Sequence, residues 1–263
     1  MKLKINDLSF SYNGAKTLDG ITLDIKGKEI LGIVGPNGSG KTTLLKCINN
    51  KLRPKAGSVL LDDTDISRLS PRETAKNIGV VPQVSSVSFP FTVYDMVMMG
   101  RYSQKGRFEP ENENDRSIVY QSLDSTGIAH MSERVITEIS GGEYQRVIIA
   151  RALAQEPRIL LLDEVTLHLD INHQIEILDL IKMLSGKNNL AIVMVLHDLS
   201  LAARYATKAV MLQKGRIAAT GTPENVISVE NVRNIYGIEA EISRTRQGNF
   251  INVVPISIVA KEE

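Results

Sequence analysis

The sequence predicts an α/β fold with a mainly parallel core sheet, an antiparallel β edge and a helical subdomain. From residue 35 onward, short apolar runs alternate with segments of helical period, the order typical of parallel strands connected by helices. Residues 2–31 instead read as short strands broken by "NGAK" and "DG", turn signals that favour an antiparallel edge. Residues 84–138 carry few strand signals, so we expect a helical insertion there.

Five apolar runs are the candidate core strands, because each has the length or the branched side chains of a buried strand. They are the runs 29–34, 79–81, 159–162, 190–196 and 209–212. Directly after the first run and the turn that follows it, "TLLKCINN" spaces its apolar residues like a helix packed on one face. From about Asn225 the chain reads as a helix followed by a strand pair.

The composition narrows the class of protein. The formal net charge is +1 with no dense run of lysines and arginines, which disfavours nucleic-acid binding. The cleanest apolar run, 190–196, is far shorter than the about 20 residues that a membrane span needs. The start of the chain lacks the apolar core of a signal peptide. The single cysteine, Cys47, fits a reducing cytoplasm, and we expect it to be a small packed residue.

The stretch "GPNGSGKT" stands between the first core strand and the following helix. Glycines in such a turn let backbone N–H groups converge on an anion, and the start of the helix adds its own unpaired N–H groups. Lys41 would then reach the β- and γ-phosphates of a nucleotide, and the Thr42 hydroxyl would complete the shell of a magnesium ion. The alternative is a glycine-rich turn that binds nothing. The full pattern in this strand and helix context favours a P-loop.

Two further strand ends carry polar residues. The run "RILLLDE" places Asp163 and Glu164 at the end of a buried strand, at the edge where a parallel sheet collects ligands. Asp163 can hold magnesium and Glu164 can orient and deprotonate water, whereas the structural alternative is a solvated turn. His197 follows another apolar strand and can contact a γ-phosphate, although such a histidine is more often structural. Asp198 can cap the next helix.

The segment "ISGGE" predicts a helix that begins near Gly141. Ser140 and Glu143 have the spacing of a capping box. Two glycines in a first turn cost about 1 kcal/mol each relative to alanine, so a second role is expected. Ser140 and the N–H groups of Gly141 and Gly142 could approach a γ-phosphate. Capping and anion contact can both hold, because they use neighbouring donors.

Taken together, these motifs resemble the ATP-binding subunits of ABC transporters. They follow the family's order over residues 3 to about 220: Walker A at 35–42, the Q-loop glutamine Gln83, the signature at 139–143, Walker B ending at Glu164, the D-loop ending at Asp170, and the switch histidine His197. Tyr12 matches the aromatic residue that stacks on adenine. Four positions depart from the family: Ile139 replaces leucine, Val165 replaces proline, and Leu167 and His168 stand at commonly small positions.

The resemblance implies the residues of an ATP and Mg²⁺ site. The catalytic residues are Glu164, His197 and Gln83. The metal ligands are Thr42, Gln83 and Asp163. The nucleotide contacts are Tyr12, Gly35, Pro36, Asn37, Gly38, Ser39, Gly40, Lys41, Thr42, Thr43, Ser140, Gly141, Gly142, Glu143 and Asp170.

The resemblance also implies domains. Residues 1–84 and 139–224 would form a RecA-like ATP-binding core with its antiparallel β subdomain. Residues 85–138 would form the helical subdomain, with the signature at its end, and residues 225–263 a helix and strand extension.

The implied partners are a second copy of the chain, in a head-to-tail pair with two ATP molecules between the copies, and the permease subunits of a transporter. An external binding protein takes part indirectly, and the location is the cytoplasmic face of the membrane. Two sequence segments, "FTVYDMVMMGRY" and "LSPRETAKNIGVVPQ", resemble those of the subunits that serve importers of ferric siderophores, haem and cobalamin. We therefore expect an importer of metal chelates, iron complexes first, then cobalamin or haem, with molybdate or tungstate as a further option. A soluble ABC ATPase without a transport role and a nucleotide-binding module without hydrolysis are the alternatives.

Overall fold

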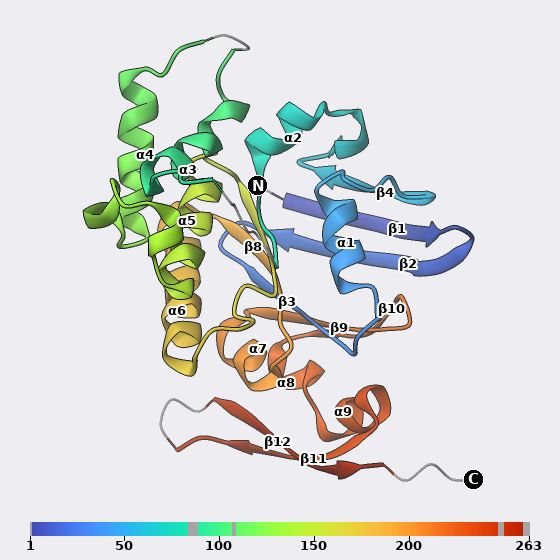
Figure 1. Ribbon diagram of the computed structural model, residues 1–263. Coiled ribbons are helices and arrows are strands. Elements are labelled where there is room, and N and C mark those ends of the chain that lie inside the picture. The colour runs from blue at the N-terminus through green and yellow to red at the C-terminus, as the bar shows by residue number, and fades with distance from the viewer. Residues whose placement is uncertain (1, 84–88, 107–108, 247–249, 260–263) are drawn as a thin grey trace. The chain divides into compact units, whose positions relative to one another are not determined.

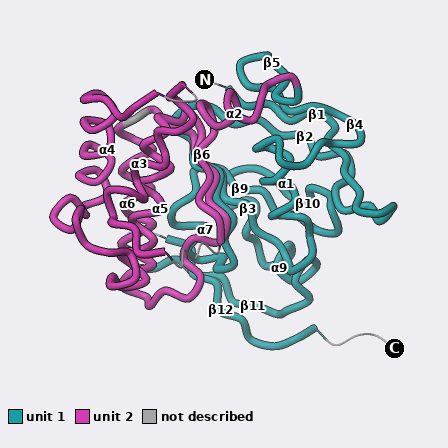
Figure 2. The backbone as a smooth tube through the Cα atoms, turned by 45° about the horizontal axis from the view of Figure 1, so that its top comes forward, with its two compact units in different colours: residues 1–67, 193–263 teal, residues 68–192 magenta. Residues whose placement is uncertain are grey.

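The computed structural model describes residues 2–83, 89–106, 109–246 and 250–259. The chain divides into two compact units, which Figure 2 shows in different colours. Unit 1 comprises residues 1–67 and 193–263, and unit 2 comprises residues 68–192. The domain boundaries expected from the family resemblance follow a different division and stay a prediction. In the segment 85–108, residues 85–88 and 107–108 lie outside the described residues, and so does residue 84.

Unit 1 contains an antiparallel sheet built on a long hairpin (Figure 1). Its strand order is β2-β1-β4-β5, with β1 (Lys2–Tyr12), β2 (Ala15–Lys26), β4 (Ala56–Leu61) and β5 (Thr64–Asp65). Asn13 and Gly14 both have positive φ, 45° and 86°, and form the predicted turn between β1 and β2. Two left-handed residues in a two-residue loop match the twist of the strands on either side.

The predicted break at "DG" is wrong. Gly20 has a φ of 66°, but it lies inside β2, where the pairing register shifts between Leu8↔Ile21 and Phe10↔Leu18. A bulge of this kind absorbs a left-handed residue without reversing the chain. The strand therefore continues through Asp19 and Gly20 to Lys26.

The remaining strands of unit 1 form a mixed arrangement in the order β10-β9-β3-β8. The strands are β3 (Ile30–Val34), β9 (Lys208–Gln213) and β10 (Arg216–Gly221), together with the residues of β8 (Ala191–Val195) from Val193 onward. β3 runs parallel to β9, and β10 returns antiparallel. All five residues of β3 are buried, which agrees with its uninterrupted apolar sequence. Helices α1 (Lys41–Ile48) and α7 (Leu199–Tyr205) follow β3 and β8 along the chain.

The C-terminal part of unit 1 has two short helices where one was expected. They are α8 (Pro223–Val226) and α9 (Val229–Tyr236), followed by the antiparallel pair β11 (Ile238–Arg244) and β12 (Ile251–Ile258). Ser228 divides the helices, because its side chain accepts a hydrogen bond from the Asn231 N–H and caps α9 as a new helix. Gly237, with a φ of 68°, ends α9 and leads into β11.

Unit 2 contains the predicted helical insertion between two parallel strands. The strands are β6 (Ile78–Val81) and β7 (Ile159–Asp163), paired from Ile78↔Ile159 to Val81↔Leu162, and β8 begins beside β7. The helices are α2 (Pro71–Asn77), α3 (Val93–Met98), α4 (Glu113–Ser125), α5 (Gly141–Leu153) and α6 (Ile171–Asn188), with short 3-10 turns at Met99–Ser103, Ala129–Met131 and Ile136–Glu138. No described helix is both long and apolar enough to span a bilayer.

A buried ion pair ties the helical part of unit 2 together. The Arg101 guanidinium Nε donates to the Asp115 carboxylate at 3.1 Å, and its Nη1 donates to the Ala154 carbonyl at 2.7 Å. The three residues lie at the turn after α3, in α4 and at the end of α5, so one side chain joins three elements. Such a pair is favourable only when its remaining donors and acceptors also find partners, as they do here.

Candidate nucleotide-binding site

The loop between β3 and α1 depends on its glycines. Gly35, Gly38 and Gly40 have φ values of 147°, 75° and 102°, a region that other residues rarely adopt. A Cβ on Gly35 would overlap the Leu212 carbonyl oxygen, and one on Gly40 would lie 2.9 Å from the Thr17 carbonyl oxygen. Nothing lies within 4 Å of a Cβ on Gly38. The glycine is therefore needed for backbone conformation at Gly38, and for both conformation and space at the other two positions.

Two side chains of the loop are buried. The Lys41 ammonium donates to the carbonyl oxygens of Gly35 at 2.8 Å and Pro36 at 3.0 Å, which folds the side chain back along the loop. Ser39 is 3% exposed, and its Oγ has no hydrogen-bond partner within the part of the chain that the structure describes. A buried hydroxyl without a protein partner is costly unless a ligand satisfies it. Together with the start of α1, this arrangement fits the phosphate group of a nucleotide.

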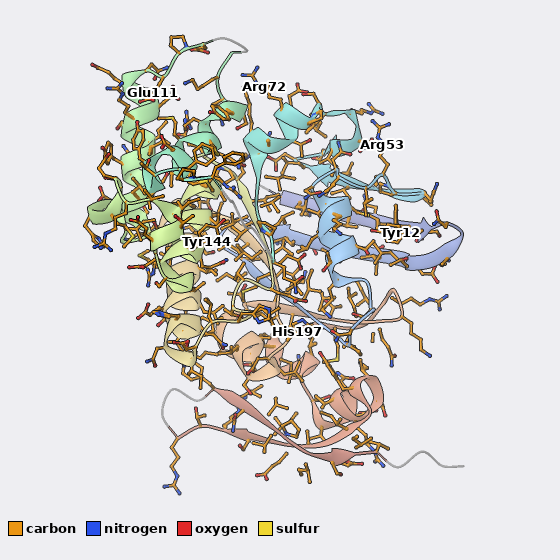
Figure 3. The ribbon with its side chains drawn as sticks, viewed as in Figure 1. Tyr12, Arg53, Arg72, Glu111, Tyr144 and His197 are labelled. Atoms are coloured by element: carbon orange, nitrogen blue, oxygen red, sulfur yellow. The ribbon has the colours of Figure 1, made fainter. Side chains whose placement is uncertain are left out.

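Unit 1 also holds Tyr12 and His197, both labelled in Figure 3. Tyr12 is at the hairpin end of β1, 43% exposed, with its ring edge-on to Phe10 at 4.8 Å between centroids. His197 follows β8 and is exposed. The predicted cap is confirmed, because the Asp198 carboxylate accepts from the Leu201 N–H at 2.9 Å and starts α7.

Unit 2 brings Gln83 and Glu164 together. Their strands, β6 and β7, are parallel neighbours, so the residues after the two strands meet at the same edge. The Gln83 Nε2 donates to the Glu164 Oε2 at 2.6 Å. A neutral amide beside the carboxylate orients it without neutralising it. An oriented carboxylate of this kind suits a general base, and that role for Glu164 stays a prediction here.

Glu164 also has an uncommon backbone conformation. Its φ of 54° is left-handed, a strain that proteins keep where the surrounding structure fixes it. Two contacts do so here: the Leu167 N–H donates to the Glu164 carbonyl at 3.0 Å, and Val165 is buried. Val165, the residue that replaces the family's proline, thus anchors the turn in the core. Leu167 and His168, the other departures, are exposed, and His168 is left-handed with a φ of 65°.

The capping box at the start of α5 is confirmed. The Ser140 Oγ accepts from the Glu143 N–H at 3.3 Å, and the Glu143 carboxylate accepts from the Ser140 N–H at 2.7 Å and from its hydroxyl. These two Ser140 hydrogen bonds, the backbone one first, lower the pKa of Glu143. Gly141 is exposed at this helix start, whereas Gly142 is buried.

The expected Mg²⁺ ligands supply oxygen donors of the kind this ion prefers. They are the hydroxyl of Thr42, the amide oxygen of Gln83 and the carboxylate of Asp163. The described residues contain no cluster of three or more histidine, cysteine or acidic side chains that would form a protein-only metal cage. One carboxylate with a few neutral oxygens suits an ion that arrives with a nucleotide and keeps waters or phosphates as ligands. The chemistry of these oxygen donors fits Mg²⁺, and their assignment to one ion stays a prediction.

Two residues lie beside predicted site residues although no local sequence motif points to them. His173, in the first turn of α6, contacts Gly142 of the signature segment. Tyr236, at the end of α9, has a phenol whose pKa burial raises to about 12, and the nearby Gly35 backbone partly opposes that shift. Burial likewise raises the pKa of the Cys47 thiol to about 12, which confirms Cys47 as a packed residue. Neither contact of His173 and Tyr236 can be read from spacing along the chain.

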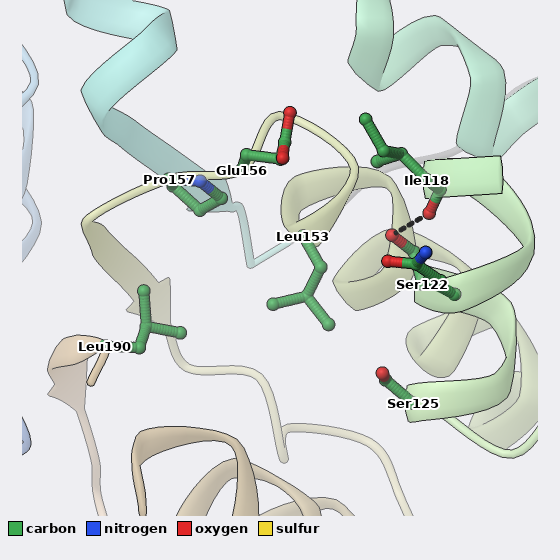
Figure 4. Close-up of a pocket in the computed structure, with 8 residues that line it drawn as sticks. Ile118, Ser122, Ser125, Leu153, Glu156, Pro157 and Leu190 are labelled. Carbon is green, nitrogen blue, oxygen red and sulfur yellow. Dashed lines mark hydrogen bonds between the residues drawn. The ribbon is translucent and has the colours of Figure 1, made fainter. Parts of the chain in front are cut away.

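A separate cavity of about 350 Å³ lies in unit 2 (Figure 4). Its walls come from α4, from the end of α5 and from the segment before β8, and they include Ser122, Ser125, Leu153 and Leu190. None of the residues predicted for the nucleotide site lines it. The cavity is therefore not the site described above.

Comparison with known proteins places this arrangement in a family. The sequence pattern of the family described as "ABC transporter" matches residues 18–167. The "Uncharacterized ABC transporter ATP-binding protein MJ0089" of Methanocaldococcus jannaschii is 42% identical over 97% of this chain and 98% of that protein. The ferric enterobactin transport ATP-binding protein FepC of Escherichia coli is 34% identical over 98% of this chain and 96% of that protein. The cobalamin import ATP-binding protein BtuD of Halobacterium salinarum is 38% identical over 97% of this chain, which spans 64% of that protein.

A solved structure agrees with the sequence relatives. An ABC transporter assigned to the metal-chelate type, in an inward-facing conformation, superimposes with a TM-score of 0.85 at 29% identity, covering 97% of this chain and 96% of the other. The chain therefore belongs to the ABC transporter family and is an ATPase of the ABC type. The predicted family and fold class are confirmed.

Proposed function

We propose that this chain is the ATP-hydrolysing subunit that powers an importer of iron(III)-siderophores or of a related metal chelate. The hydrogen bond between Gln83 and Glu164 carries the proposal, because it equips a chain that has a P-loop with an oriented general base. The relatives support the solute class: FepC is named for ferric enterobactin, and a Bacillus subtilis protein 40% identical over 90% of this chain is named as a probable siderophore transport subunit.

ATP binding is assigned to residues of unit 1. The N–H groups of the loop 35–40 and the start of α1 would surround the phosphates, and Ser39 would gain the partner that it lacks in the protein. Lys41 would exchange its bonds to the loop carbonyls for bonds to the β- and γ-phosphates. The exposed ring of Tyr12 would stack on the adenine. Each of these contacts favours a nucleoside triphosphate over a smaller anion.

Hydrolysis is assigned to the carboxylate of Glu164. Water would attack the γ-phosphorus, its proton would pass to Glu164, and the bond from the γ-phosphorus to the bridging oxygen would break to give ADP and phosphate. Gln83 holds the carboxylate in place, and His197 would contact the γ-phosphate. Mg²⁺, held by Thr42, Gln83 and Asp163, would neutralise charge on the phosphates.

Transport would follow from a head-to-tail pair of subunits. The signature residues Ser140 to Glu143, with Asp170, would meet the ATP on the P-loop of a second copy, so that ATP joins the copies and hydrolysis releases them. The permease would dock on the described part of the segment 85–108. Two aromatic residues there, Phe89 and Tyr102, are largely exposed at 68% and 66%, and docking would cover them. The subunit would then work at the cytoplasmic face of the membrane.

The deciding experiment reconstitutes the subunit with its permease and external binding protein and measures phosphate release. We expect a ferric siderophore to stimulate ATPase activity, and we expect the Glu164→Gln complex to show no stimulation with the same ligand. Haem tests a related metal chelate, and molybdate and tungstate are the control ligands, each with the same complex. A complex that hydrolyses ATP but responds to none of the metal chelates would contradict the proposed solute class.

Cobalamin is the second candidate solute. The Halobacterium salinarum relative named for cobalamin import matches 97% of this chain at 38% identity, a higher identity than that of FepC. The same reconstituted complex distinguishes the two, because stimulation by cobalamin without stimulation by ferric siderophores would favour this second assignment.

A further inference from the structure

Gly142 and Gly141 are glycines for different reasons. A Cβ on Gly142 would lie 2.9 Å from the Cγ of His173 and 3.1 Å from its Cδ2 and Nδ1, whereas real Cβ contacts are essentially never shorter than 3.0 Å. A Cβ on Gly141 would meet only the Leu169 Cδ2, at an ordinary 3.9 Å. The imidazole ring thus fills the place of a side chain at Gly142. A methyl group there would require the partly exposed His173 ring to shift.

The ring of His173 is held on its other side. Its Nδ1 lies 3.4 Å from the Glu176 Oε2, and the same oxygen accepts from the Arg146 Nη2 at 2.9 Å. Arg146 belongs to α5, and its Nη1 donates to the Thr126 carbonyl at 3.0 Å. The hydrogen bond from Arg146 first, and that from His173 next, lower the pKa of Glu176. The ring, whose side chain is 41% exposed, thus lies between Gly142 of α5 and Glu176 of α6.

The chain that leads into α6 also contacts the start of α5. Leu169 approaches Gly141, and its carbonyl accepts from the Gln174 Nε2 at 2.8 Å. Asp170 is the N-cap residue of α6, and His173 follows in its first turn. The D-loop residue Leu169 therefore lies near Gly141, and His173, three residues after the D-loop, lies against Gly142.

We propose that His173 is a positioning residue for ATP hydrolysis, whose ring packs against Gly142 and fixes the signature segment to the D-loop. This inference rests on the proposed function, in which the signature segment contacts ATP on a second copy. A displacement of the D-loop then moves the signature segment with it, because no space separates the ring from the glycine backbone. The affinity of the same subunit's P-loop for ATP is not part of this coupling.

The test is a double-mutant cycle in the reconstituted complex. Gly142→Ala is expected to lower kcat at least tenfold, although alanine is the better helix former, and His173→Ala is expected to lower it severalfold. The double variant Gly142→Ala with His173→Ala is expected to recover to the level of His173→Ala, because the space for the new methyl group is then open. The dissociation constant of a fluorescent ATP analogue for the single subunit is expected to stay unchanged in all three.

Two controls make the result specific. Gly141→Ala, in the same helix turn, is expected to gain nothing from His173→Ala. His173→Phe keeps a planar ring without the contact to Glu176, and it is expected to retain most of kcat. A double variant no better than Gly142→Ala would overturn the proposal, and so would a His173→Phe complex as slow as His173→Ala.

Measurements of Tm test this inference independently of the proposed function. Gly142→Ala is expected to lower Tm and the double variant to restore it, whether or not the complex hydrolyses ATP. A wild-type complex without ATPase activity would therefore reject the proposed function alone. Additive effects on Tm across the cycle would reject the packing of His173 against Gly142.

Discussion

Gly35 shows how closely the P-loop backbone is packed. Its φ of 147° and the adjacent Leu212 carbonyl leave no place for a Cβ, and the Ser39 Oγ would lie 2.9 Å from that atom as well. Gly38 differs, because its φ of 75° is positive but the space around it is open. Comparing Gly35 with Gly38 therefore distinguishes the effect of steric overlap from that of a positive φ alone.

We predict that Gly35→Ala destabilises the protein by about 2–4 kcal/mol, through overlap with the Leu212 carbonyl and an unfavourable φ. Gly38→Ala is the matched control and should cost only about 1 kcal/mol, the strain of a left-handed alanine. Urea unfolding followed by circular dichroism measures both. Equal losses in the two variants would mean that the contact with Leu212 is unimportant.

At the scale of elements, the C-terminal hairpin holds the helix that follows His197. The Ser200 Oγ, in α7, accepts from the Val253 N–H of β12 at 3.0 Å. The Arg204 guanidinium, on the same helix, lies 5.0 Å from the centroid of the Phe250 ring. Because α7 begins two residues after His197, these contacts fix the helix on which the histidine depends.

Ser200→Ala should therefore affect both stability and catalysis. It leaves the part-buried Val253 N–H without its acceptor, which should lower the free energy of unfolding by about 1–3 kcal/mol. We also expect kcat of the complex to fall while ATP affinity stays the same. Ser257→Ala, at an exposed position of β12, is the control for the loss of a hydroxyl. Unchanged unfolding of the Ser200 variant would argue that solvent replaces the hydroxyl at this site.

The buried pair of Arg101 and Asp115 gives unit 2 a pH dependence. Burial alone would raise the pKa of Asp115, but the hydrogen bonds from Arg101 and from the Asn112 backbone hold it below its ordinary value of 3.8. A carboxylate with a lowered pKa stabilises the folded state at pH values above about 4, and that contribution is lost as the pH falls through its folded pKa.

Asp115→Asn should lower the free energy of unfolding by about 1.5–3 kcal/mol at pH 7, because it removes the charge that faces Arg101 and Lys105, while Arg101 keeps its ion pair with Glu156. The difference from the wild type should shrink in acid, where the wild-type carboxyl also becomes neutral. Unfolding in urea between pH 7 and pH 3 measures this. A difference that stays constant over that range would exclude the charge as its cause. Asp124→Asn, at an exposed position of the same helix, is the control.

At the scale of the whole molecule, the P-loop and the proposed general base belong to different compact units. Tyr12, the P-loop and His197 are in unit 1, whereas Gln83, Glu164 and the signature segment are in unit 2. The division explains why single changes can separate binding from turnover. A change in the general base leaves the phosphate-binding loop intact.

We predict that Glu164→Gln lowers kcat by about 10²–10⁴ and keeps ATP bound. The retained γ-phosphate should hold two copies together, so the variant should elute as a dimer with MgATP and as a monomer without it. Phosphate release and light scattering during size-exclusion chromatography measure the two effects. Glu230→Gln, at an exposed position of α9, is the control and should remain active. Rapid turnover by the Glu164 variant would remove Glu164 from the role of base.

Much of the fold and the nucleotide loop follows from local rules in the sequence. The buried strands, the turn at Asn13-Gly14, the cap at Asp198 and the capping box of Ser140 and Glu143 each depend on residues within a few positions of one another. The bulge at Gly20 escaped prediction, because a left-handed glycine serves a turn and a bulge equally well and only strand pairing decides between them.

The sequence by itself determined the family, the phosphate-binding loop and the polar residues at the strand ends. Only the tertiary structure decided which distant residues meet: Gln83 with Glu164, His173 with Gly142, and Ser200 with Val253. The physical reason is the distance along the sequence over which each interaction acts. Turn chemistry and apolar periodicity act between near neighbours, whereas a contact across tens of residues depends on how whole strands and helices pack.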